Sequence, residues 1–187
     1  MTDTHSLANQ FLIAMPGLSD PNFSQTVTYL FKHDTDGAMG IVINRPMKMP
    51  LGEVFEQLKL PCENPAMMKR TVLQGGPVQP EQGFVIHPAG GNWEYSVPVS
   101  DGIQITTSRD ILASMASGAG PDSALVALGY AGWGAGQLEA EITHNSWLTV
   151  PVDRRVLFEM PYEERWRAAA NLLGIDLSKM SPDAGHA

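Results

Sequence analysis

Cysteine is almost absent from this chain, because Cys62 is the only one among its 187 residues. A single thiol excludes an intrachain disulfide and any zinc site built on several cysteines. No apolar run approaches the roughly 20 residues that a membrane-spanning helix needs. The first residues, Met1 to His5, also lack the basic region of a secretory signal peptide. We therefore expect a cytoplasmic protein without a membrane segment.

Positive charge is also scarce. The sequence has 12 Lys and Arg against 20 Asp and Glu, which gives a formal net charge of -8. No run of arginines exceeds the pair Arg154 and Arg155. Binding to a phosphate backbone depends on clustered Lys and Arg, so this balance disfavours direct contact with nucleic acid.

Apolar residues, at 43 % of the chain, are sufficient for one packed core, and no linker or repeat divides the sequence. We predict a single domain over residues 1–187, with a frayed tail from about residue 178. Short apolar or alternating runs predict strands at 11–15, 26–31, 39–44, 83–87, 93–97, 103–106, 124–128 and 147–150. Helix patterns occur at 51–58, 107–118, 136–144 and 161–174.

The most secure local feature is a hairpin, in which Asp34 to Gly37 supply the turn between two β-rich runs. Pro46 is expected to end the second strand, and residues 62–69 are expected to form a loop. Strands outnumber helices, and helices do not follow every strand. The pattern therefore predicts an α+β fold with a mixed or mostly antiparallel sheet, rather than a doubly wound parallel one.

Residues 128–141 contain an unusual concentration of glycine beside Tyr130 and Trp133. We expect a buried strand that ends at Leu128, a tight glycine turn, and a helix that starts after Gly136. Such a corner can cradle a phosphate, but its glycine spacing is not that of a dinucleotide site and no phosphate-loop lysine is present. A corner in which glycines let the aromatic rings approach the backbone is the favoured interpretation.

Residues with catalytic chemistry are few. Glu141 and His144 have the Glu-x-x-His spacing of di-metal helices, but the second copy that such a site needs is missing. No nucleophile elbow is present. Cys62 lies beside Glu63 and not beside a basic group that would activate it, so an ordinary thiol is favoured over a reactive one. These patterns identify no catalytic residue, no metal ligand and no cofactor.

Two arginines occur where a strand ends or a helix begins, at Arg45 and Arg109. Groups at such positions are well placed to bind a ligand. The alternative is an arginine bonded to a nearby carboxylate or to backbone carbonyls. With Trp133 and Asn145, which flank the predicted helix after Gly136, these arginines form our candidate ligand or partner surface.

The order of several motifs resembles the AlgH/YqgE family, also called UPF0301 or DUF179. The motifs are Met15 to Leu18, Asp20 to Phe23, Gly40 to Pro46, Gly75 to Pro77, Thr107 to Asp110, Gly129 to Glu141, and Asn145 with Trp147. The resemblance implies a bacterial cytosolic protein with a mixed sheet that closes into a barrel-like core with flanking helices. Family members are labelled transcriptional regulators linked to alginate production, and the family supplies no catalytic residue or cofactor to carry across.

We therefore expect a non-enzymatic regulatory or adaptor protein that acts through a protein or a small molecule. Two alternatives remain open. One is an enzyme, for example a hydrolase, with a site near Glu139, Glu141 and His144. The other is a regulator that binds DNA directly, although no helix-turn-helix is evident and the acidic charge opposes it. The partner and the oligomeric state are not predicted.

Overall fold

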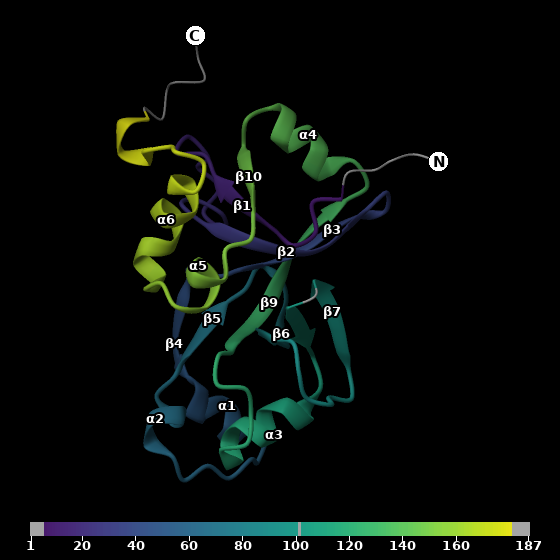
Figure 1. The fold of residues 1–187 in the computed structure, drawn as a ribbon, viewed down its shortest axis with the longest axis vertical. Helices are drawn as coiled ribbons and strands as arrows, with labels where there is room; N and C mark the ends of the chain where they lie inside the picture. Colours follow the sequence, from purple (N-terminus) through teal and green to yellow (C-terminus); the bar gives the residue numbers. More distant parts are fainter. Residues whose placement is uncertain (1–5, 101, 181–187) are drawn as a thin grey trace.

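The structure, a computed structural model, describes residues 6–100 and 102–180 (Figure 1). Its strands are β1 Gln10–Ala14, β2 Val27–Asp34, β3 Gly37–Val42, β4 Pro46–Pro50, β5 Thr71–Gln74, β6 Val78–Pro88, β7 Ser96–Ser100, β8 Ile103–Thr106, β9 Leu125–Gly134 and β10 Trp147–Pro151. Its α-helices are α1 Leu51–Gln57, α2 Pro65–Met68, α3 Arg109–Ser117, α4 Gln137–Thr143, α5 Arg154–Phe158 and α6 Arg165–Asn171. Two 3-10 helices, η1 Tyr162–Glu164 and η2 Leu177–Lys179, complete the set.

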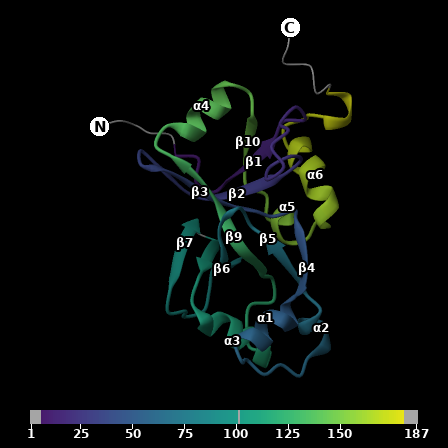
Figure 2. The ribbon, with the colours of Figure 1, turned by 180° about the vertical axis from the view of Figure 1, so that it is seen from behind.

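The strands form one mixed sheet in the order β10-β1-β2-β3-β9-β6-β8-β7, with β5 added to β9 and β4 added to β5. The pair β5 and β9 is parallel, whereas the other pairs are antiparallel. The sheet curls into a half-barrel with helices around it, as two opposite views show (Figures 1 and 2). The predicted α+β fold is confirmed.

Strand β9 organises the sheet because it pairs with three other strands. Its first half pairs with β5 and β6, and residues 131–134 pair with β3. Gly129 lies between these halves with a φ of 80°, a left-handed value that favours glycine. The Cβ that a larger residue would add at Gly75 falls 2.4 Å from the Gly129 carbonyl oxygen, so glycine also permits close backbone contact here.

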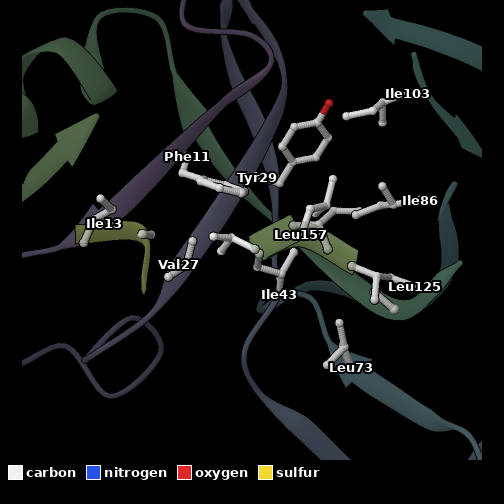
Figure 3. Close-up of a cluster of buried hydrophobic side chains, with 14 of the residues drawn as sticks. Phe11, Ile13, Val27, Tyr29, Ile43, Leu73, Ile86, Ile103, Leu125 and Leu157 are labelled. Atoms are coloured by element: carbon white, nitrogen blue, oxygen red, sulfur yellow. The ribbon is translucent and has the colours of Figure 1, made fainter. Parts of the chain in front are cut away.

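Residues 11–14 of β1, 84–86 of β6 and 125–127 of β9 are buried on both faces of the sheet, which explains why these segments read as continuous apolar runs. Alternate residues such as Phe84 and Ile86 contribute to the largest core cluster, beneath α5 and α6 (Figure 3). Val85 and Val126 point to the other face, where α1 and α3 pack. A third cluster lies beneath α4 and includes Leu138, Trp133 and Trp147.

Several predicted boundaries are wrong. Pro46 begins β4 instead of ending a strand, and the loop expected at 62–69 contains α2, which starts at Pro65. Proline is compatible with a first strand position and with the first helical turn, where its missing N–H is not needed. The glycine turn lies at residues 135 and 136, because β9 continues to Gly134. The register with β3 holds this glycine-rich end in the sheet.

The C-terminal region differs in detail from the expectation. The helix predicted at 161–174 is divided into η1 and α6, and α5 was not predicted. The expected frayed tail began at about residue 178, but η2 includes Ser178 and Lys179. Residues 181–187 lie outside the described part of the chain.

Candidate binding cleft

Arg45 is tied to the loop that precedes β2. One guanidinium nitrogen donates to the Pro21 carbonyl at 2.7 Å, and the other donates to the Ser24 carbonyl at 2.9 Å. Burial lowers the pKa of Arg45, while the charge of Asp20 acts in the opposite direction. This half-buried side chain therefore joins two segments of the fold.

Trp133 is 6 % exposed and belongs to an aromatic cluster with Trp147 and Phe23. Both indole N–H groups donate to the same carboxylate oxygen of Glu141, each at 2.9 Å. The second carboxylate oxygen accepts a 2.9 Å hydrogen bond from the Gln137 amide. Glu141 thus holds α4 on the ends of β9 and β10.

Asn145 follows α4 with a φ of 63°, a left-handed conformation that asparagine tolerates better than most residues. Its backbone N–H donates to the Ile142 carbonyl at 2.9 Å and closes the end of the helix. The side chain is exposed. Arg45, Trp133 and Asn145 therefore each satisfy a local structural requirement.

The three residues of the predicted enzyme alternative have separate partners. Glu139 contacts His33 at 3.3 Å, with the imidazole Nε2–H directed at the carboxylate because Nδ1 accepts the Leu7 N–H. The Nδ1–H of His144 donates to the Ala140 carbonyl one turn earlier, at 2.7 Å. Glu141 binds the two tryptophans, as described above. The three groups do not converge on one reacting position.

Arg109 lies at a different place, at the mouth of a cleft of about 510 Å³. The lining residues of the cleft come mainly from α1, α3, β4, β6 and β9. Figures 1 and 2 show α1 and α3 at one end of the molecule. The apolar lining consists of Met47, Met49, Val54, Leu58, Pro80, Phe84, Val85, Leu112, Val126 and Leu128. The volume and the apolar walls are typical of a site for a small molecule.

The polar groups of the cleft lie on α1, at the junction of β8 and α3, and on a bulge of β6. They are Gln57, Glu81, Gln82, Thr106, Thr107, Ser108 and Arg109. The pairing of β6 with β9 is irregular between Val78 and Gly83, so residues 79–82 bulge, and the exposed side chains of residues 80–82 line the cleft. A bulge is a recurrent means of redirecting side chains beside a site.

Arg109 is exposed and donates one hydrogen bond, of 2.7 Å, to the Leu58 carbonyl. Within residues 6–100 and 102–180, no carboxylate oxygen lies within the 4.0 Å of an ion pair from its guanidinium. The guanidinium carries five N–H donors, so most of its donor capacity is left for a ligand.

The wall beside Arg109 is held by Asp110. Its carboxylate accepts hydrogen bonds from the Ser108 hydroxyl and from the backbone N–H of Glu94, the latter at 2.8 Å. Burial acts to raise the pKa of Asp110, but these hydrogen bonds outweigh it and hold the pKa below its ordinary value. Ser108 is the N-cap residue of α3.

Thr106 connects the cleft to a buried histidine. The Nδ1–H of His87 donates to the Pro88 carbonyl at 2.8 Å, and Nε2 lies 2.7 Å from the Thr106 hydroxyl. Burial lowers the pKa of His87, although the bond to Pro88 opposes the shift. The neutral ring can thus accept a hydrogen bond from the Thr106 hydroxyl, and this contact fixes this part of the wall.

Sequence patterns missed most of the cleft, because its lining comes from segments between Met47 and Leu128 that only the folded sheet brings together. Arg109 was the one predicted site residue within it. Cys62 is half-buried, and its thiol lies 3.7 Å from the Asn64 carbonyl. No group of three or more His, Cys, Asp or Glu is placed to hold a metal among the residues described. None of the described helices has the length and apolar character of a membrane span.

The curled sheet, its flanking helices and the apolar cleft define the chain as an α+β half-barrel protein. Residues 11–178 match the AlgH-like family DUF179, and the chain belongs to that family. A UPF0301 protein of Thioalkalivibrio sulfidiphilus is 56 % identical over 100 % of both chains. Another, from Saccharophagus degradans, is 53 % identical over 97 % of this chain and 89 % of its own.

Two solved structures share the fold. The solution structure of the AlgH protein from Pseudomonas aeruginosa has a TM-score of 0.80 and 49 % identity, over 95 % of this chain and 94 % of that one. A crystal structure of a Corynebacterium diphtheriae protein has a TM-score of 0.69 over 92 % and 90 % of the two chains. Its identity is 16 %, so that likeness concerns the fold alone.

Proposed function

We propose that this chain is a cytoplasmic, non-enzymatic regulatory or adaptor protein whose working site is the cleft beside Arg109. The observation that carries the proposal is the cavity of about 510 Å³, with mainly apolar walls and with exposed polar groups, Arg109 among them, at the rim. A site of this kind binds a small molecule through apolar contact and uses the polar groups to orient it.

The composition of the lining favours binding over covalent chemistry. Among the residues that the structure describes, the lining contains neither histidine nor cysteine, and its one carboxylate is that of Glu81. Its one serine, Ser108, is bonded to Asp110 and to the backbone N–H of Tyr95. Nucleophilic catalysis needs an accessible hydroxyl or thiol beside a base. Thr106 and Ser108 do lie beside a base, His87 and Asp110, but both residues are buried and their hydroxyls are hydrogen-bonded within the wall.

A bound molecule would touch α1, α3, β4, β6, β8 and β9 at once, because all of them contribute to the lining. Occupancy would therefore favour one arrangement of these elements over others, which is the physical requirement for a ligand-dependent adaptor. The net charge of -8 supports a protein partner over nucleic acid.

The direct test is to purify the protein under native conditions, unfold it, and identify the released small molecules by mass spectrometry. Gly83→Val should block the cleft, since Gly83 lines it and an added Cβ meets only Leu128, at 3.9 Å. Gly132→Val is the matched control, because Gly132 is an exposed strand glycine that does not line the cleft.

We expect one compound to accompany the wild type and Gly132→Val and to be lost from Gly83→Val. Equal recovery from all three would contradict a role for the cleft. A pull-down from the native cell, with and without nuclease, then examines the adaptor role. A protein partner should be recovered in both arms, and Gly83→Val should reduce the amount recovered. Loss of the partner on nuclease treatment would instead favour a nucleic-acid regulator.

A further inference from the structure

We infer that the ligand of the cleft is an amphipathic monocarboxylic acid, with its apolar chain in the cavity and its carboxylate on Arg109. The inference rests on the proposed function and goes beyond it by naming the class of ligand. It is argued from the composition of the apolar lining, from the exposed arginine at the mouth, and from two carboxylates that limit the charge of the ligand.

The apolar walls fit a flexible chain. Met47 and Met49 contribute unbranched, polarisable side chains from β4, and Leu112 and Val126 add aliphatic groups to the same lining. Methionine adapts its shape to different apolar partners at low cost. The buried hydroxyls of the lining, on Thr106 and Ser108, are already bonded to His87 and Asp110, so apolar contact dominates in the cavity.

The mouth offers a site for one negative charge. Arg109 donates to Leu58 through a single nitrogen, and no carboxylate among the described residues lies within 4.0 Å of its guanidinium. Exposed Thr107, which also lines the mouth, adds a hydroxyl to the same end. A planar guanidinium matches the two oxygens of a carboxylate and forms paired hydrogen bonds with them.

Two acidic side chains disfavour a more highly charged head group. Glu81 lies on the rim, where it would repel a second negative charge. Asp110 already occupies the N-terminus of α3 and accepts from Ser108 and Glu94, so the helix dipole is not available to a phosphate. A single carboxylate satisfies Arg109 with the least repulsion.

The test compares decanoic acid, decanol and decylamine, which share a chain and differ in the head group. Each is titrated into the full-length protein by calorimetry, with the Arg109→Gln variant and the control Arg155→Gln. Arg155 is exposed on α5 and does not line the cleft. We expect the acid to bind about tenfold more tightly than the alcohol, and the amine to bind most weakly.

Arg109→Gln should remove the preference for the acid while leaving the affinity for decanol unchanged, and Arg155→Gln should preserve both. The acid ligand would be overturned if acid and alcohol bound equally well and Arg109→Gln changed neither affinity. If Gly83→Val still abolished binding in that case, the proposed binding function of the cleft would remain. If Gly83→Val did not alter the affinities, both the acid ligand and the proposed binding function of the cleft would be overturned. Thermal unfolding of each variant verifies that it is folded.

Discussion

Arg165 donates a 2.8 Å hydrogen bond to the carbonyl oxygen of Ile43, across 122 residues of chain. The arginine is 2 % exposed, donates a second bond to Met160 at 2.9 Å, and lies 4.5 Å from the centre of the Tyr162 ring. Burial lowers its pKa to about 10. No carboxylate pairs with it among the residues described, so its charge is stabilised by carbonyl dipoles and by the aromatic face.

Replacing Arg165 with alanine should therefore destabilise the protein strongly. The change leaves two carbonyls without their donors and opens a cavity between α6 and the sheet. We expect the free energy of unfolding to fall by about 3 kcal/mol or more in urea titrations. Arg167→Ala, on an exposed residue of the same helix, should lie within about 0.5 kcal/mol of the wild type. Similar effects of both changes would show that Arg165 is not a structural tether.

Glu141 gives a second prediction, which separates a structural role from the enzyme alternative. Glu141→Ala removes the acceptor of both indole N–H groups, and should lower the free energy of unfolding by about 2–4 kcal/mol. Glu139→Ala removes one contact of a carboxylate that is 51 % exposed, and should cost less than about 1 kcal/mol. Tryptophan fluorescence during denaturation measures the free energy of unfolding of both variants. A stable Glu141→Ala would leave the catalytic hypothesis open.

The glycines beside β9 also differ in a way that can be measured. A Cβ at Gly76 would lie 2.1 Å from the carbonyl carbon of Tyr130, whereas one at Gly132 meets its first neighbour at an ordinary 3.4 Å. Gly76→Ala should therefore lower stability by about 3 kcal/mol or more, because backbone would have to move. Gly132→Ala should change it by less than about 1 kcal/mol. Equal unfolding midpoints would contradict the close approach of the two segments.

Local patterns predicted the elements whose cause is local. The β2–β3 hairpin follows from the turn at Asp34 to Gly37, and α1 follows from the spacing of Leu51, Val54 and Phe55. These signals act between near neighbours in the chain, so they can be read without the fold.

Elements that depend on distant partners were misread. The glycine-rich end of β9 has weak strand propensity, but its pairing with β3 outweighs that preference. Arg45 resembled a displayed ligand group, yet its carbonyl acceptors lie more than 20 residues earlier. The cleft itself had no signal in the sequence, because its walls become neighbours only when the sheet has formed.

The two arginines of the predicted surface should respond differently to the same substitution. Arg45→Gln breaks two hydrogen bonds to the loop before β2, and we expect stability to fall by about 1–2 kcal/mol. Arg109→Gln breaks one bond at an exposed position and should stay within about 0.5 kcal/mol of the wild type. Chemical denaturation of both single variants measures this contrast. If Arg109→Gln proved the more destabilising, Arg109 would be a structural residue and not a ligand group.

Tyr29 gives a prediction about alkaline pH. The side chain is fully buried and its hydroxyl donates to the Asn9 side chain at 2.7 Å. Burial raises the pKa of Tyr29 above its ordinary value of 10.0. In the unfolded chain the phenol loses its proton first, so the folded state binds more protons above pH 10.0. The contribution of Tyr29 to stability is therefore complete below that pH and declines above it.

Tyr29→Phe should be less stable than the wild type at neutral pH and more stable than it at high pH. At neutral pH the variant lacks the bond to Asn9 and should be less stable than the wild type by about 1 kcal/mol. Above pH 10.0 folding of the wild type alone must keep a buried phenol protonated, which costs stability. The difference in stability between the two proteins should therefore shrink and then change sign. Arg165 is present in both proteins, so its own titration cancels in the comparison. Urea unfolding in a series of alkaline buffers measures the difference, and a gap that stays constant with pH would contradict the raised pKa.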